Sequence, residues 1–222
     1  MTPAAIDPAT NGVEKKAEKP SHPSPVALAH CVLRTTAANY PGMVHFYRNL
    51  LNAQIVHETP VLMFLRYDFE HHRIAILQTP ETTAKAENTT SAEVDHIAFS
   101  YSSLTALART YVSLKSIQKP LLPIWTVNHG PTTSLYYRDP DGNKVELQVD
   151  NFEDAKEADA FMKGPLFGMN PIGTDFDVEE WASRILGKAK QDGQEGLDKD
   201  EVKHMKMRSE IGERYDLPEG LI

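Results

Sequence analysis

The sequence predicts an α+β fold in which two tandem βαβββ modules pair into one incomplete barrel around a metal site. Three observations support this prediction. The central part of the chain repeats internally, each copy closes with a β-hairpin, and the strand pattern stops after Asp150, where a helical C-terminal tail begins. An internal repeat is the first feature to seek, because it decides the architecture before any single element does.

The chain of 222 residues divides into three parts. Residues 1–24 are rich in Pro, Lys and Ala with few bulky apolar side chains, so we expect disorder. Residues 25–150 hold the paired modules, with repeat 1 at about 25–80 and repeat 2 at about 92–150. Residues 151–222 form the helical C-terminal extension, which carries no strand pattern.

The composition excludes several classes of function. A net charge of −8 without a long basic run argues against binding to nucleic acid or to an anionic membrane surface. The single cysteine, Cys31, rules out a disulfide within the chain and fits a reducing compartment, so we expect a cytoplasmic protein. No apolar run is long enough for a membrane span, and the N-terminus does not resemble a signal peptide.

Each module opens with a strand that carries a histidine at the same place. The strands are Leu28–Arg34, with His30, and Val94–Ser100, with His96. A helix is expected after each strand, at Tyr40–Leu51 and at Leu104–Leu114, because apolar residues recur there at helical spacing.

Each module closes with a hairpin. The segment Leu62–Gln78 forms it in the first copy and Ser134–Val149 in the second, where Asp-Pro-Asp-Gly makes the turn. Alternation places Val145, Leu147 and Val149 on one face and Glu146 on the other. Alignment of Ala75–Gln78 with Val145–Gln148 sets Ile76 at the position equivalent to Glu146.

Equivalent strands of two paired modules face a shared cavity, so His30, His96 and Glu146 are expected to converge there. Two imidazoles and a carboxylate on one side of a metal form the arrangement associated with non-haem Fe(II) and O₂ chemistry. We therefore predict Fe(II), with Mn(II) or another divalent ion as the alternative. By the repeat, Ile76 holds the fourth position around the cavity, and its aliphatic side chain has no donor atom for a metal. The competing interpretation is two core histidines and an exposed strand glutamate.

The chain resembles the vicinal-oxygen-chelate (glyoxalase/bleomycin resistance/extradiol dioxygenase) superfamily over about Val26–Val149. Within it, the chain is most similar to the type I extradiol dioxygenases, the biphenyl-2,3-diol and catechol 2,3-dioxygenase group. The residues that carry the match are His30 in Ala-His-Cys-Val-Leu, His96 in Val-Asp-His-Ile-Ala-Phe, and Tyr-Tyr-Arg-Asp-Pro-Asp-Gly-Asn-Lys-Val-Glu-Leu. The resemblance implies ring cleavage of a catechol-like diol with O₂ in the presence of iron.

Three further residues match positions that act on substrate in this family. His72 lies in His-His-Arg-Ile-Ala and corresponds to an acid/base beside the metal; a period of two also places it with Ile76 on the cavity face and His71 outside. Tyr136 matches the tyrosine that hydrogen-bonds a substrate oxygen. His129 sits in a His-Gly loop near the open side of the metal. A hairpin-tip histidine, a core tyrosine and a loop histidine are the structural alternatives.

The tail and the functional alternatives complete the predictions. Helices are expected from Asp177 to about Lys188, after a capping-box pattern, and roughly from Lys199 to Arg214. Three functions fit: an Fe(II) extradiol dioxygenase, a glyoxalase-like lyase, isomerase or thiol transferase, and a metal-free binding protein. The first is favoured because three ligands converge and Ile76 prevents a closed metal shell. We expect a small aromatic substrate and a homodimer, since unpaired sheet edges need cover.

Overall fold

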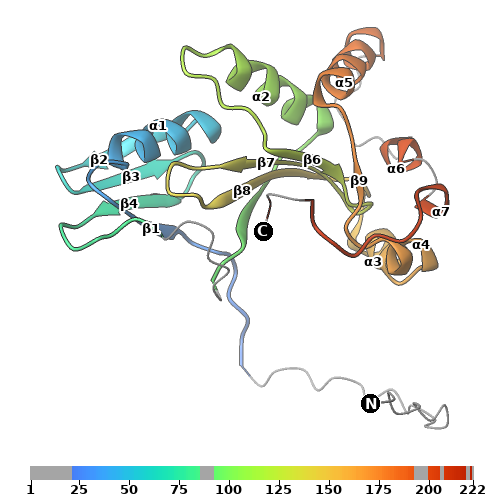
Figure 1. The fold of residues 1–222 in the computed structure, drawn as a ribbon, viewed down its shortest axis with the longest axis horizontal. Coiled ribbons are helices and arrows are strands. Elements are labelled where there is room, and N and C mark those ends of the chain that lie inside the picture. The colour runs from blue at the N-terminus through green and yellow to red at the C-terminus, as the bar shows by residue number, and fades with distance from the viewer. Residues whose placement is uncertain (1–21, 86–92, 193–199, 206–207, 219–220, 222) are drawn as a thin grey trace.

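The computed structural model describes residues 22–85, 93–192, 200–205, 208–218 and 221. The segment expected to be disordered, residues 1–24, lies outside the described residues except for its last three, which form no helix or strand. None of the helices in the described ranges has the length and apolar character needed to cross a membrane. Figure 1 shows two sheets, with one helix covering each and a C-terminal extension beside the second.

The first module has the predicted βαβββ order. Its elements are β1 (Cys31–Thr35), α1 (Tyr40–Leu50), β2 (Gln54–Glu58), β3 (Leu62–Arg66) and β4 (Ile74–Gln78). The sheet order is β1-β4-β3-β2, in which β1 runs parallel to β4 and the other pairs are antiparallel. Pro41 in the first turn of α1 suits a position where no backbone N–H is needed. Strand β1 begins one residue after His30, later than expected.

The second module repeats this order. Its elements are β5 (His96–Ser100), α2 (Leu104–Ser116), β6 (Trp125–Asn128), β7 (Thr132–Arg138) and β8 (Lys144–Asp150). Ser103 caps α2 by accepting a hydrogen bond from the Ala106 amide. The predicted turn joins β7 to β8, and Gly142 adopts φ of 86° there, a conformation that glycine allows without strain. The sheet order is β5-β8-β7-β6-β9.

One apolar core lies beneath the two helices and joins both modules. On β8 the alternating residues Val145, Leu147 and Val149 are fully buried in it, as the hairpin pattern predicts. Ile74 and Ile76 of β4 belong to the same core. The opposite face of each sheet points away from α1 and α2, and we call it the outer face. It carries Glu146 in the second sheet.

Contacts on the helix side tie the modules together. The Tyr47 hydroxyl in α1 donates a buried hydrogen bond of 2.9 Å to Asp139, in the turn between β7 and β8. Asn39 donates to Asp141 in the same turn at 2.8 Å, and Figure 1 shows this turn reaching α1. The two modules are therefore held in one arrangement by α1 and the β7–β8 turn.

Replacing Tyr47 by phenylalanine should destabilise the protein by about 1–3 kcal/mol, because the buried Asp139 carboxylate then loses one partner. Tyr40→Phe on the same helix is the matched control. The Tyr40 hydroxyl is buried and has no hydrogen-bond partner among the described residues, so its removal should cost nothing. Urea unfolding curves measure both. Equal losses in the two variants would show that the Tyr47–Asp139 bond contributes little.

The α+β class and the two modules are confirmed, and the described strands form no closed barrel. The two sheets are not paired with each other in the described part of the chain. Among the described strands, β1 and β5 each end one sheet with a partner on one side only, and β2 and β9 end the same sheets on the other side. The open edges that the sequence predicted are thus present at β1 and β5.

The C-terminal extension is largely helical, as expected. It contains α3 (Ala155–Met162), α4 (Pro165–Met169), α5 (Val178–Asp192), α6 (Asp200–His204) and α7 (Arg208–Ile211). Asp177 caps α5 by accepting from the Glu180 amide at 2.8 Å, and Trp181 and Ile185 enter the core. Two predictions were wrong. A short strand, β9 (Thr174–Asp175), pairs with β6, and the second predicted helix is two short helices.

Candidate metal centre and substrate pocket

Strand register places the candidate residues of the second module on its outer face. Ala98, Glu146 and Tyr136 lie side by side on β5, β8 and β7, and Trp125 on β6 extends the row. His96 stands two residues before Ala98, so it shares their face. The alternation that buries Val145 and Leu147 in the core therefore delivers a histidine, a carboxylate and a phenol to one surface.

His96 and Glu146 form a pair with the geometry of metal ligands. The Nε2 atom of His96 lies 3.1 Å from a carboxylate oxygen of Glu146. The other ring nitrogen donates to Asp95 at 2.7 Å, and Lys144 donates to the second oxygen of Asp95 at 2.7 Å. A histidine whose second nitrogen is held by a carboxylate is oriented as a ligand, with Nε2 left to face a metal. This arrangement fits a divalent ion.

The electrostatics of this pair favour positive charge beside Glu146. The hydrogen bond to Glu146 raises the pKa of His96 above its ordinary value, and the contact with Asp95 adds to this effect. Burial by itself would raise the pKa of Glu146, but hydrogen bonds from His96 and Ser134 outweigh it and lower that pKa. Glu146 is thus an ionised carboxylate with a side chain only 6% exposed, and an anion in such a place attracts a positive partner.

Aromatic side chains flank the pair. The Trp125 ring stacks on the Tyr136 ring with centroids 4.9 Å apart, and Nε2 of His129 lies 3.1 Å from the Tyr136 hydroxyl. The other nitrogen of His129 contacts the carbonyl oxygen of Ile172 in the tail connector. Burial and the charge of Glu146 raise the pKa of Tyr136, so the phenol keeps its proton at neutral pH. Together with His96 and Glu146, these residues form the second-module cluster.

The first-module cluster consists of His30, His71 and His72. One nitrogen from each of the three rings lies within 4.8 Å of the others, and the centroids of His30 and His72 are 4.5 Å apart. The His72 ring also packs on Phe64, with centroids 4.5 Å apart. Phe64 on β3 pairs with Ala75 on β4, as Tyr136 on β7 pairs with Glu146 on β8, so Phe64 lies on the outer face of the first sheet. His72, whose ring packs on Phe64, therefore lies over that face.

The prediction that His71 points away from the site is only partly correct. His71 is exposed and one ring nitrogen contacts Glu70 at 2.6 Å, yet its ring also touches the His72 ring. Partial burial lowers the pKa of His72, and the nearby His30 and His71 add to this effect. His72 is therefore a neutral imidazole at pH 7, able to accept a proton.

The prediction that Ile76 faces the cavity was wrong. Cys31 pairs with Ile74 in the first sheet, and its counterpart Ile97 pairs with Val145 in the second. The residue equivalent to Glu146 is therefore Ala75, and Ile76 is fully buried in the core beneath α1. The register was off by one, although the chemical conclusion survives, because alanine has no donor atom either.

The structure does not unite the three predicted ligands within one chain. His96 and Glu146 meet, whereas His30 belongs to the first-module cluster. Among the described residues, that cluster is the one set of three histidine, cysteine or carboxylate donors within 4.8 Å of one another. Each sheet thus carries part of the expected centre.

Several residues of the site were not predicted. Asp95 could have been recognised, because it directly precedes His96 in a strand that the repeat had identified. Nothing in the sequence pattern marked Trp125 or Leu221 as part of the site. Leu221 is buried against Trp125 and Tyr136, and its carbonyl oxygen accepts from Lys144 at 2.7 Å. Leu221 therefore lies against the outer face of the second sheet, and Figure 1 shows that face on the side away from α2.

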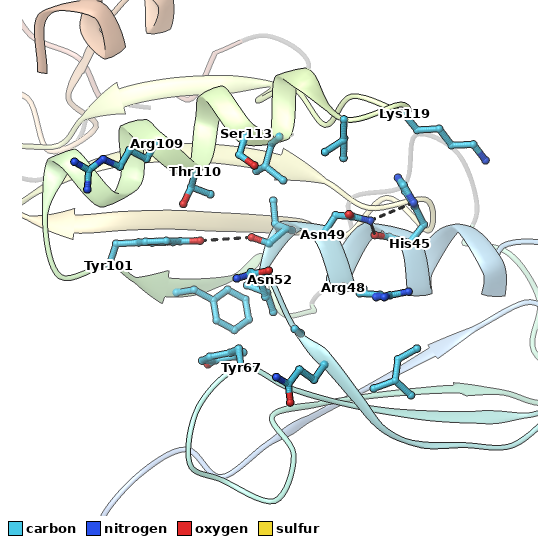
Figure 2. A pocket seen from close by; sticks show the side chains of 18 of the residues that line it. His45, Arg48, Asn49, Asn52, Tyr67, Tyr101, Arg109, Thr110, Ser113 and Lys119 are labelled. Carbon is cyan, nitrogen blue, oxygen red and sulfur yellow. Dashed lines mark hydrogen bonds between the residues drawn. The ribbon is translucent and has the colours of Figure 1, made fainter. Parts of the chain in front are cut away.

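A separate groove lies on the helix side, between α1, α2 and the end of β5 (Figure 2). Its volume is about 1550 Å³. The lining includes Arg48, Arg109 and Lys119 but none of the predicted site residues. The groove follows the junction of the two modules and does not open onto the candidate metal ligands.

Comparisons with known proteins find similarity over most of the two modules. The family model described as Glyoxalase/Bleomycin resistance protein/Dioxygenase superfamily matches residues 27–147. Biphenyl-2,3-diol 1,2-dioxygenase 2 of Rhodococcus globerulus is 45% identical over 150 residues, which cover 68% of this chain and 76% of the relative. Biphenyl-2,3-diol 1,2-dioxygenase 3 of the same organism is 40% identical over 68% of this chain and 77% of its own length.

Solved structures show more distant similarity. The fosfomycin resistance protein FosX from Mesorhizobium loti is 17% identical and aligns with a TM-score of 0.44, over 61% of this chain and 98% of that chain.

Proposed function

Since the chain belongs to the glyoxalase/bleomycin resistance protein/dioxygenase superfamily, we propose that it is an Fe(II)-dependent extradiol dioxygenase, which cleaves a catechol-like diol with O₂. The identity of 45% to a biphenyl-2,3-diol 1,2-dioxygenase supports this reaction class. The structural observation that carries the proposal is the His96–Glu146 pair, oriented by Asp95 on an outer face lined with aromatic side chains.

The ligands proposed for the metal are His30, His96 and Glu146. Two imidazoles and one carboxylate form the face that leaves open positions for substrate and O₂. When bound, Fe(II) supplies the electron transfer to O₂ that makes ring cleavage possible under mild conditions. Both atoms of O₂ enter the product, so the reaction needs no external reductant.

The remaining residues of the site bind substrate and move protons. The Tyr136 hydroxyl, held by His129, can donate a hydrogen bond to a substrate oxygen. Neutral His72 can accept the proton of one substrate hydroxyl and return it later. Trp125 and Leu221 supply the apolar wall that an aromatic ring requires.

The donor-free position at Ala75 favours a dioxygenase over a glyoxalase-like lyase or a thiol transferase. A fourth protein ligand at this position would close the metal shell and leave less room for a diol and O₂ together. Ala75 lies in the row that carries Glu146 in the other sheet, so a longer side chain there would point over the same outer face.

Metal analysis and oxygen uptake test the proposal. Protein purified without oxygen should contain close to one iron per chain and should consume roughly one O₂ per molecule of 2,3-dihydroxybiphenyl or catechol. A yellow ring-opened product should appear at the same rate. Stoichiometric zinc or nickel without oxygen uptake would instead favour a lyase or transferase, and a metal-free protein would contradict the proposed function.

Substitution of Ala75 by glutamate should change the metal preference. The new carboxylate adds a fourth donor, so oxygen uptake should fall by at least tenfold while zinc or nickel is retained more firmly. Competition between Fe(II) and Zn(II), measured by elemental analysis, provides the readout. Ile76→Glu is the control: it should unfold the protein, because it places a charge in the core. Unchanged turnover in Ala75→Glu would refute the register.

A further inference from the structure

We infer that the tail connector (residues 170–173) is a positioning element of the substrate pocket, because it holds His129 in the orientation that faces Tyr136. The inference rests on the proposed function, in which His129 and Tyr136 lie beside the substrate. The connector belongs to the C-terminal extension, between α4 and β9, and so comes from outside the two modules. The βαβββ repeat by itself would therefore leave this part of the pocket incomplete.

His129 donates a hydrogen bond to the connector. One of its ring nitrogens, Nδ1, lies against the carbonyl oxygen of Ile172. A carbonyl oxygen can only accept, so Nδ1 must carry the proton of this hydrogen bond. In a neutral imidazole Nε2 is then the acceptor, and the Tyr136 hydroxyl lies 3.1 Å from it. The backbone of the connector therefore determines which nitrogen of His129 faces the pocket as a proton acceptor.

Asn170 and Gly173 close the connector into a tight turn. Asn170 is fully buried, its side-chain oxygen accepts from the Gly173 amide at 2.7 Å, and its side-chain nitrogen donates to the Gly173 carbonyl at 3.2 Å. Gly173 has φ of 113°. A Cβ atom there would collide with the backbone oxygen of Asn128 and lie 2.9 Å from the Cα atom of His129. A side chain at this position would therefore push the connector away from the loop that carries His129.

The loop that carries His129 is itself fixed by buried hydrogen bonds. Asn128 is 4% exposed, and its side-chain oxygen accepts from the Gly130 amide at 2.8 Å and from the Asn151 side chain at 3.1 Å. The side-chain nitrogen of Asn128 donates to the backbone oxygen of Glu201 in α6 at 2.9 Å. A satisfied buried network makes its surroundings rigid. Displacement of the connector should therefore break its contact with His129 instead of moving the loop along with it.

The rest of the extension anchors the connector. Strand β9 follows it directly and pairs with the end of β6. Arg214 donates to the Gly173 carbonyl at 3.1 Å and to Asp175 at 2.9 Å. The Ile172 side chain packs against the buried cluster that holds Tyr136. The same four residues thus orient a polar group of the pocket and complete its apolar wall.

The tautomer of His129 provides the first test, and it needs no turnover. Nitrogen-15 NMR of histidine-labelled protein, loaded with diamagnetic Zn(II), distinguishes a protonated Nδ1 from a protonated Nε2, and the His129→Gln variant identifies the signal. We expect the wild type to hold the proton on Nδ1. Gly173→Ala should lose this preference, whereas Gly168→Ala, where a Cβ atom meets nothing within 4 Å, should keep it. A wild-type His129 protonated on Nε2 but not on Nδ1 would overturn the inference.

A double-mutant cycle shows whether the connector acts through His129. Gly173→Ala should lower the turnover number for a catechol by about 10–100-fold with KM and iron content little changed, because a misplacement of about 1 Å can cost about 10²-fold in rate. In the His129→Gln background, the same substitution should change turnover by less than about twofold. Equal losses in the two backgrounds would show that the connector only supports the fold, and would equally overturn the inference.

Two further points keep the outcomes distinct. If far-ultraviolet circular dichroism shows that Gly173→Ala does not fold, the wild-type tautomer still decides, and Asn170→Ala replaces it in the cycle because it removes both side-chain hydrogen bonds of the turn. The expected tautomer in a protein that consumes no O₂ with any diol would uphold the orientation of His129 and reject the dioxygenase. An active wild type with His129 protonated on Nε2 alone would reject only the positioning role.

Discussion

Glu146→Gln is expected to abolish retention of the divalent metal. The substitution removes the single anionic ligand while keeping the shape of the side chain, and amides are poor ligands for a metal that prefers imidazole and carboxylate. Replacing a residue that only supports a ligand typically lowers metal affinity by about 10–100-fold. Replacing the ligand itself should therefore lower the affinity by more than roughly 100-fold. Oxygen uptake should fall to background. Equilibrium dialysis against Fe(II) under anaerobic conditions measures the affinity.

Asp95→Asn is the matched control. Asp95 accepts a hydrogen bond from the far nitrogen of His96 and does not touch the metal position. Its loss should therefore lower the metal affinity by only about 10–100-fold. Metal-free Glu146→Gln should unfold within about 1 kcal/mol of the wild type, because the apolar face of β8 is unchanged and glutamine can accept from Ser134. Full iron occupancy in Glu146→Gln would rule out the proposed ligand set.

The repeat explains why the modules were predictable. Each βαβββ unit has local signals that do not depend on its partner: helical spacing in α1 and α2, the Asp-Pro-Asp-Gly turn, and alternation along β8. The same alternation correctly separated Glu146 from Val145 and Leu147. When a charged residue stands among apolar ones in a strand, the alternation of side chains is enough to predict which sheet face each residue lies on.

The error at Ile76 shows the limit of that method. Strand β4 reads Ile74-Ala75-Ile76-Leu77, all apolar, so the period of two carries no information about which face is which. The register had to be taken from alignment with β8, and hairpins of different length can displace such an alignment by one residue. Only the pairing of Cys31 with Ile74 settles that Ala75 occupies the outer row.

Long-range contacts account for what the sequence could not indicate. Strand β9 has two residues and exists because Val127 and Asn128 offer an edge to Thr174 and Asp175. Leu221 packs in one cluster with Tyr136, which lies far from it in the sequence, so no local pattern could indicate the contact. Whether His30 meets Glu146 in its own chain depends on how the modules pack on their helix side, and no local pattern encodes that choice.

His72→Phe should slow turnover by about 100-fold or more without releasing the metal. A diol binds as an anion after one hydroxyl proton leaves, and the same proton is needed when the ring opens. A group that holds it between the two steps contributes about 10²–10⁴-fold. Phenylalanine keeps the ring that packs on Phe64, so the cluster retains its shape while the proton carrier is lost. Stopped-flow spectroscopy on iron-loaded protein separates diol binding from turnover.

His71→Phe is the neighbouring control, and pH completes the test. His71 is exposed and bonded to Glu70, so its loss should change turnover by less than about threefold. The pKa of His72 is lowered, so its neutral form persists below the usual histidine range. Wild-type activity should therefore decline on acidification only below about pH 6.5, as His72 gains a proton and can no longer accept one. His72→Phe should lack this decline. If His71→Phe were instead the damaging variant and His72→Phe silent, the proton carrier would be His71, and the outer-face position of His72 would have no catalytic role.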